Sequence, residues 1–126
     1  EKFEKFILPK KIKIGNIYKK IFQSNDIETT QKVPKNSKTV YWLNSIFFKK
    51  KSIKNVRKIG KLLEKNGIEV RSGFWPLNKL KNFNSQYVGS KKVSEEVFNK
   101  SLVLPSNLNI SFKNVLYFKK IIDKNL

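Results

Sequence analysis

The densest group of side chains suited to ligand binding lies within residues 67–78. One planar cation, Arg71, is followed by two aromatic rings, Phe74 and Trp75, and then by the amide of Asn78. The proline after the second ring fixes its own φ and moves the preceding residue toward an extended conformation, which stiffens the loop. We predict that these four side chains line a binding pocket. The alternative is that the two rings simply fill the core.

The composition excludes several kinds of catalytic site. The chain contains no cysteine and no histidine, which excludes disulfides, thiolate chemistry, Ser-His triads and the usual zinc sites. Its nine carboxylates are scattered, and the adjacent Glu95 and Glu96 would diverge by about 100° on a helix. A Gly-rich phosphate loop is also absent, and the pattern marks out no lysine as a Schiff-base former. We therefore predict no catalytic, cofactor-binding or metal-binding residue within this chain.

The chain is strongly basic, with a formal net charge of +19 at pH 7. Such a charge ordinarily indicates a nucleic acid or another anionic partner. However, only two of the 28 basic residues are arginine, the side chain preferred for base readout and bidentate phosphate binding. The lysines are also spread over nearly the whole chain. We interpret them as a solvated surface, and keep a stand-alone basic module that binds nucleic acid or another polyanion as the alternative.

The length and apolar content limit the number of domains and indicate a folded chain. With 126 residues, of which 39% are hydrophobic and 13% aromatic, the chain is predicted to form one folded domain over residues 1–126. No apolar run approaches the roughly 20 residues of a membrane span, and no signal-peptide pattern opens the chain, so we expect a cytoplasmic protein with no membrane partner. The chain begins with Glu1 and contains no methionine, so we expect an incomplete reading frame.

The first half of the chain predicts a helix, a loop and a central strand. Apolar residues recur every three or four positions over residues 10–23, which predicts a helix whose opposite face carries Lys11 and other lysines. Residues 24–38 are polar and predict a connecting loop. Residues 40–48 are aromatic and β-branched, and apolar on both faces except at two positions, which predicts a central strand covered on both sides.

The second half alternates short strands and helices. Ser52 is a suitable N-cap for a second helix, and Gly67 supplies the left-handed residue that ends it. Strand 68–71 follows, and residues 79–90 are irregular, with Phe83 and Tyr87 as anchors. Further along we predict a helix over residues 93–99, capped by Ser94, a strand over residues 102–104, and a last helix over residues 112–124, capped by Ser111.

The order of several short motifs resembles one enzyme family. The strand segment Tyr41-Trp-Leu43 is followed by the helix end and strand Leu63-Glu-Lys-Asn-Gly-Ile-Glu-Val-Arg71 and by the loop Phe74-Trp-Pro-Leu-Asn78. Val93-Ser-Glu-Glu-Val97 and Leu102-Val-Leu-Pro-Ser106 then precede the last helix. From about residue 9 onward, this sequence is similar to the C-terminal small domain of the DegT/DnrJ/StrS family of sugar aminotransferases.

The resemblance implies a fold and a site. Members of the family use pyridoxal phosphate to transfer an amino group to a keto-sugar, usually one carried on a nucleotide, and act as homodimers in polysaccharide or antibiotic-sugar synthesis. Their small domain is α+β, with a mostly antiparallel sheet and helices packed on it. By match to the aromatic–proline loop, Arg71, Phe74, Trp75 and Asn78 are the expected substrate-binding residues, although the family commonly has a histidine at the last position.

The resemblance also implies that much of the enzyme is missing. The family's Schiff-base lysine, phosphate-binding residues and pyridine-pairing aspartate belong to a large domain that would lie upstream of Glu1. We therefore expect a fragment that neither binds pyridoxal phosphate specifically nor transaminates by itself. Its expected partners are that large domain, a nucleotide-sugar substrate and a second copy of the chain, bound through the first helix or the Phe74-Trp75 loop.

Overall fold

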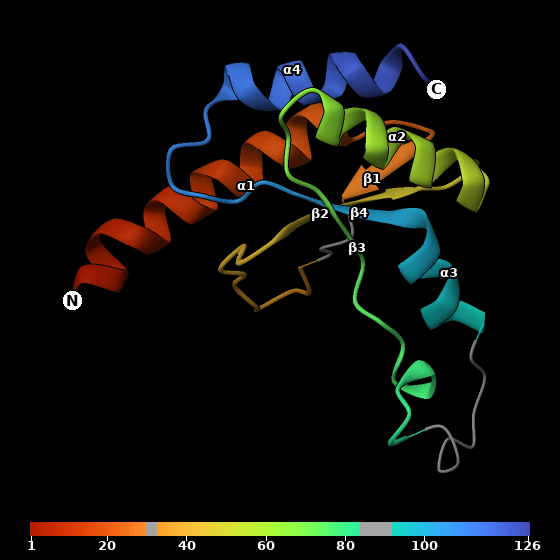
Figure 1. Ribbon diagram of the computed structural model, residues 1–126. Coiled ribbons are helices and arrows are strands. Elements are labelled where there is room, and N and C mark those ends of the chain that lie inside the picture. Colours follow the sequence, from red (N-terminus) through yellow and green to blue (C-terminus); the bar gives the residue numbers. More distant parts are fainter. Residues whose placement is uncertain (30–32, 84–91) are drawn as a thin grey trace.

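The fold is α+β, as predicted, in a computed structural model that describes residues 1–29, 33–83 and 92–126. Within these ranges, four short strands form one antiparallel sheet, and three of the helices lie on one side of it (Figure 1). Helix α3 (Lys92–Lys100) lies at one end of the sheet, next to the chain segment that follows β3 (Arg71–Ser72). No helix among the described residues is both long and apolar enough to cross a membrane.

The sheet has the strand order β1-β2-β4-β3. The strands are β1 (Ile27–Thr29), β2 (Asn44–Phe48), β3 (Arg71–Ser72) and β4 (Ser101–Leu104), and each neighbouring pair is antiparallel. β2 is therefore an inner strand, which confirms the central position predicted for it. β4 is the other inner strand, although it comes last in the sequence.

The core lies between one face of the sheet and three helices. These helices are α1 (Leu8–Phe22), α2 (Ile53–Lys65) and α4 (Phe112–Asp123). Alternation along β2 and β4 places every second side chain on this face. The following side chains meet there with less than 3% exposure: Tyr18, Phe22, Ile27, Ile46, Phe48, Val56, Ile59, Leu63, Leu104, Val115 and Ile122. The other face is covered less completely, since Ser45 and Phe47 are only half-buried, so the prediction of a strand covered on both sides was partly wrong.

The predicted helix boundaries at three residues are confirmed. The hydroxyl of Ser52 accepts a hydrogen bond from the backbone N–H of Asn55 at 3.3 Å, which is N-cap geometry. Gly67 has φ of +73°, in the left-handed region that ends a helix. Ser111 and Asn114 form a reciprocal capping box at the start of α4.

Two predicted boundaries in the first half were wrong. The first helix is longer than predicted, since a π-helical turn over Phe3–Ile7 leads directly into α1. The predicted strand 40–48 begins only at Asn44, because Tyr41 has φ of +46°, which turns the backbone out of the extended conformation.

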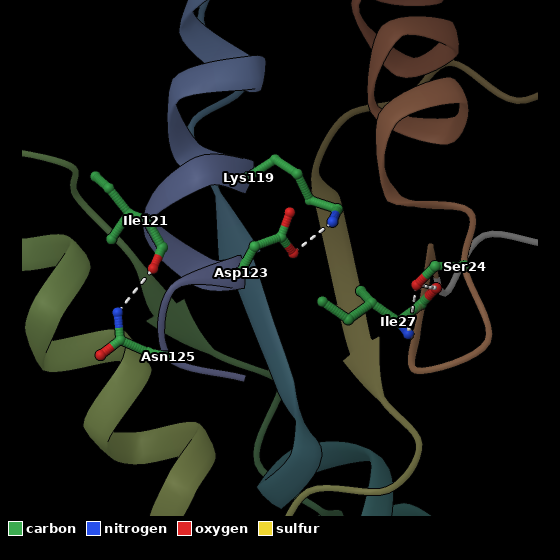
Figure 2. Close-up of polar contacts among 6 residues, drawn as sticks. All are labelled: Ser24, Ile27, Lys119, Ile121, Asp123 and Asn125. Atoms are coloured by element: carbon green, nitrogen blue, oxygen red, sulfur yellow. Dashed lines mark hydrogen bonds and ion pairs between the residues drawn. The ribbon is translucent and has the colours of Figure 1, made fainter.

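Strand β1 was missed because its residues lie in a polar stretch that was predicted to be a loop. Its entry is fixed by Ser24, whose backbone N–H donates to the carbonyl of Ile27 at 2.9 Å. The N–H of Ile27 in turn donates to the Ser24 hydroxyl at 3.1 Å (Figure 2). Figure 2 also shows the end of α4, where Lys119 pairs with Asp123 and the Asn125 amide donates to the carbonyl of Ile121 at 2.9 Å.

Three further predictions have mixed outcomes. The predicted strand 68–71 is reduced to β3, which pairs with β4 over two residues only. Helix α3 spans Lys92–Lys100, so Ser94 lies inside the helix rather than at its N-cap. In the stretch predicted to be irregular, Leu77–Lys79 forms one 3₁₀ turn and Phe83 is 47% exposed rather than an anchor; Tyr87 lies outside the described residues.

Candidate functional site

A groove of about 640 Å³ lies beside β3 and the C-terminal end of β4. Three chain segments line it: residues 42–43 before β2, residues 71–75 with Glu69 around β3, and residues 103–107 at the end of β4. These segments are distant in sequence and meet because β4 lies between β2 and β3 in the sheet. This volume is within the range of small-molecule sites in proteins.

Aromatic side chains form much of the groove surface. The rings of Trp42 and Phe74, which both line it, are neighbours, with ring centroids 6.4 Å apart and ring planes tilted by 34°. Trp75 packs on Phe98 of α3, with centroids 4.7 Å apart. Phe74 is nevertheless 72% exposed, Trp42 68% and Trp75 61%. Each ring packs on a neighbouring ring but remains more than half exposed. Such rings are suited to stacking on a ligand.

Gly73 allows the aromatic loop to approach α3 closely. An ideal Cβ at Gly73 would lie 3.3 Å from the Cα of Phe98 and 3.5 Å from the carbonyl oxygen of Val97. These neighbours are backbone atoms, which cannot move aside like the end of a flexible side chain. The glycine therefore sets the positions of Phe74 and Trp75, the two residues that follow it.

The groove contains one ion pair. Both Nε and Nη2 of Arg71 donate to the same carboxylate oxygen of Glu69, at 3.2 and 2.9 Å. The two side chains are 79% and 76% exposed, so this pair contributes little to stability. The guanidinium therefore keeps donors for a ligand, but an anionic ligand must compete with the carboxylate of Glu69.

Three of the four predicted site residues, Arg71, Phe74 and Trp75, line this one groove. Asn78 does not. It is 3% exposed, and its amide nitrogen donates to a carboxylate oxygen of Glu95 in α3 at 3.1 Å. This contact connects the 3₁₀ turn to α3, so Asn78 stabilises the loop that carries Phe74 and Trp75. A role in substrate binding stays a prediction for all four residues, of which Asn78 lies outside the groove lining.

Trp42 and Ser106 are among the lining residues that sequence reasoning missed. Trp42 was placed in a strand, whereas its segment is irregular and exposes the indole. Ser106 was seen only as the end of a motif. Its hydroxyl accepts hydrogen bonds from both the backbone N–H and the side-chain amide of Asn44, at 3.1 and 3.0 Å. Asn44 is 4% exposed, so this pair joins two walls of the groove from within.

Helix α1 supports the same two walls. The ammonium of Lys11 donates to the carbonyl oxygens of Trp42 at 3.3 Å and Ser106 at 2.5 Å, and the phenol of Tyr18 donates to the carbonyl of Pro105 at 2.8 Å. Burial lowers the pKa of Lys11 and raises the pKa of Tyr18. Lys11 was predicted to lie on the solvated face of the helix, and that prediction was wrong: it is half-buried.

The other basic residues include a row that forms no ion pair within the part of the chain that the structure describes. Seven of the nine carboxylates form ion pairs among the described residues. None of those pairs involves the basic residues of α2. Four lysines of this helix are exposed and follow one face at spacings of four, three and four: Lys54, Lys58, Lys61 and Lys65. This row is called the α2 lysine row below.

A family profile matches residues 1–122, nearly the whole chain. The chain belongs to the DegT/DnrJ/EryC1/StrS aminotransferase family. This family membership confirms the resemblance seen in the motifs around the aromatic loop. No match was found among curated proteins.

Solved structures of this family share the fold. The aminotransferase PseC of Helicobacter pylori, which is involved in the biosynthesis of pseudoaminic acid, superposes with a TM-score of 0.80 at 19% identity; the match covers 98% of this chain and 34% of PseC. A DegT DnrJ EryC1 StrS aminotransferase of Brucella abortus gives 0.77 at 16% identity, covering 97% and 32%. The sugar aminotransferase CalS13 of Micromonospora echinospora gives 0.74 at 11%, covering 95% and 31%. The chain thus spans about a third of these aminotransferases.

The described residues do not fit the family's cofactor, pyridoxal phosphate. A Schiff base requires a lysine amine in the site, and the groove lining contains no lysine. Lys11 is not among the lining residues either, and its ammonium donates to the backbone carbonyls of two of them, Trp42 and Ser106. The carboxylate in the groove, that of Glu69, is paired with Arg71 rather than placed for a pyridine nitrogen.

Proposed function

We propose that this chain is the C-terminal part of a pyridoxal-phosphate-dependent aminotransferase that acts on a nucleotide sugar in the cytoplasm, in polysaccharide biosynthesis. The match of the family profile to residues 1–122 carries the proposal. In this proposal the chain is a single domain that contributes one wall of the substrate cleft. The catalytic lysine and the cofactor site belong to a large domain outside it.

The chemistry of the groove supports a role in substrate binding. A nucleotide sugar combines flat or ring-shaped groups with a diphosphate. Trp42 and Phe74 offer faces for stacking, and the guanidinium of Arg71 offers paired donors to phosphate oxygens. The groove holds one cation and one anion, so binding the diphosphate requires Arg71 to exchange Glu69 for the ligand.

This exchange of partners predicts that substitutions at Arg71 and at Glu69 change the affinity for the substrate in opposite directions. In the complete protein, Arg71→Gln is expected to weaken binding of the nucleotide-sugar substrate about tenfold or more, because a charge-assisted hydrogen bond to the ligand is lost. Glu69→Gln is expected to strengthen it by a few-fold, because the guanidinium no longer has a competing carboxylate. Isothermal titration with UDP-, dTDP- and GDP-linked sugars measures both effects. Equal affinities in the wild type and both variants would place the substrate elsewhere.

The proposal also predicts two protein partners. The large domain of the same enzyme is one, and a second copy of the chain is the other. Exposed apolar side chains at the start of the chain and around the groove support such contacts. Phe3 and Phe6 are each 49% exposed, and Leu77 is 61% exposed beside the aromatic loop. Sedimentation velocity on the complete protein should show a homodimer, whereas a monomer at all concentrations would contradict the second contact.

The α2 lysine row favours a second candidate function, binding of a nucleic acid backbone. Its lysines extend over twelve residues, about 16 Å of helix, present about one charge per turn, and form no ion pair among the described residues. Contacts with four phosphates of a duplex would make the logarithm of affinity fall with the logarithm of salt with a slope of about −3.6.

A charge-matched comparison tests this candidate. Changing all four lysines of the row to glutamine should remove most of the salt slope for a short DNA duplex of arbitrary sequence, measured by fluorescence anisotropy. The control variant carries the same change of charge on exposed lysines of α1 and α4: Lys13, Lys19, Lys20 and Lys120. An equal loss in both variants would mean general attraction to a basic protein, and the row would then have no binding role.

A further inference from the structure

Three residues on one face of α1 hold the groove in shape. Lys11, Gly15 and Tyr18 are spaced i, i+4 and i+7, so their side chains follow one side of the helix. The Nζ of Lys11 donates to the carbonyl oxygens of Trp42 and Ser106, which lie 31 and 95 residues further along the chain. A single ammonium thus connects two walls of the groove that the sequence places far apart.

The other two residues of this face act on the same walls. Tyr18 is fully buried, and its hydroxyl donates to the carbonyl of Pro105. Gly15 has no side chain, and the ring of Tyr41 occupies the place where its Cβ would be. Tyr41 precedes the tryptophan of one wall, and Pro105 precedes the serine of the other. This face of α1 therefore contacts two consecutive residues in each wall: Tyr41 and Trp42 in one, and Pro105 and Ser106 in the other.

Lys11 is the member of this face whose contacts depend on charge. An ammonium has three donors, and two of them are used on the two carbonyls. Hydrogen bonds from a charged donor are stronger than neutral ones. Lys11 does not line the groove itself, so it acts on a ligand only through the backbone that carries Trp42 and Ser106.

We propose that Lys11 is a positioning residue for ligand binding in the groove, which holds the segments around Trp42 and Ser106 at a fixed separation. The identity of the ligand rests on the proposed function, whereas the positioning of the two walls does not. Two measurements on the full-length protein therefore test the positioning of the walls and the binding of the ligand separately.

Hydrogen exchange tests the positioning. Lys11→Met keeps an apolar stem of similar length and removes the donors, so amides at residues 42–44 and 106–107 should exchange about tenfold faster. Lys13→Met is the control, because Lys13 is exposed on the same helix. It should leave these amides unchanged. Unchanged exchange in Lys11→Met, or an equal increase in the control, would overturn the positioning role.

Kinetics test the consequence for the ligand. Lys11→Met should raise the KM for the nucleotide sugar about tenfold with little change in kcat, since Lys11 acts on the ligand only through the backbone of the two walls. Lys11→Arg, which keeps a cation with several donors, should recover part of the loss. An unchanged KM with faster exchange would show that the groove does not bind the substrate. A wild type without amino transfer would defeat the proposed function, and the exchange experiment would still decide the positioning.

Discussion

Replacing Gly15 by alanine is expected to destabilise the fold by about 1–3 kcal/mol, the range for overpacking a core. An ideal Cβ at this position would lie 2.2 Å from both Cγ and Cδ1 of the Tyr41 ring. The ring is 8% exposed, and Tyr41 has a left-handed φ, so neither side chain nor backbone has room to retreat without moving the neighbouring Trp42. The gain in helix propensity, about 1 kcal/mol, is smaller than this cost.

A second helix glycine provides the matched control. At Gly60 in α2, the nearest atom to an ideal Cβ is Cδ2 of Leu102 at 3.4 Å, an ordinary contact. Gly60→Ala should therefore be neutral or stabilising by up to about 1 kcal/mol. Urea unfolding followed by circular dichroism compares the two variants directly. If both glycines tolerate alanine equally, the Tyr41 ring does not hold the position that the structure gives it.

Replacing Ser106 by alanine is expected to cost about 2–3 kcal/mol, which is large for a half-buried serine. The change removes the acceptor of two hydrogen bonds from Asn44, one from its backbone and one from its side chain. Asn44 is 4% exposed, so both donors would lose this acceptor in a site that water reaches poorly. Each unsatisfied buried donor costs about 1–3 kcal/mol.

Ser106→Thr separates the loss of the hydroxyl from a change of size. It keeps the acceptor and should stay within about 1 kcal/mol of the wild type. Ser52→Ala is a second reference, since it removes an N-cap and should cost about 1 kcal/mol. The free energy of unfolding from urea titration ranks the three variants. A cost for Ser106→Ala below that of Ser52→Ala would contradict the role assigned to the hydroxyl.

Local rules were sufficient to predict most of the secondary structure. Periodic apolar residues predicted the helices, and small polar residues at their ends predicted where α2 and α4 begin. The rules failed where tertiary contacts dominate. β1 forms because Ile27 fills the core beside Phe48, which its polar neighbours do not indicate. The strand before Asn44 is lost because the Tyr41 ring packs on Gly15, a contact between residues far apart in sequence.

The candidate site was predictable only in its contiguous part. Arg71, Phe74 and Trp75 lie close together in the sequence, and the chemistry of those side chains suggested a pocket. Asn78 belongs to the same stretch, but the 3₁₀ turn directs it toward α3. Lys11 was predicted to be exposed because the spacing of apolar residues separates a buried face of the helix from a polar face. It does not reveal that two carbonyls from distant segments lie within reach of one ammonium.

Two of the three segments that line the groove carry Trp42 and Trp75, which are the only tryptophans in the 126-residue sequence. Both indoles are more than half exposed, so their emission responds to solvent and to any molecule that covers them. In this chain, intrinsic tryptophan fluorescence therefore arises entirely from the groove. Ligand titrations can be followed optically without a label, and replacing either indole by phenylalanine assigns the signal to one lining segment.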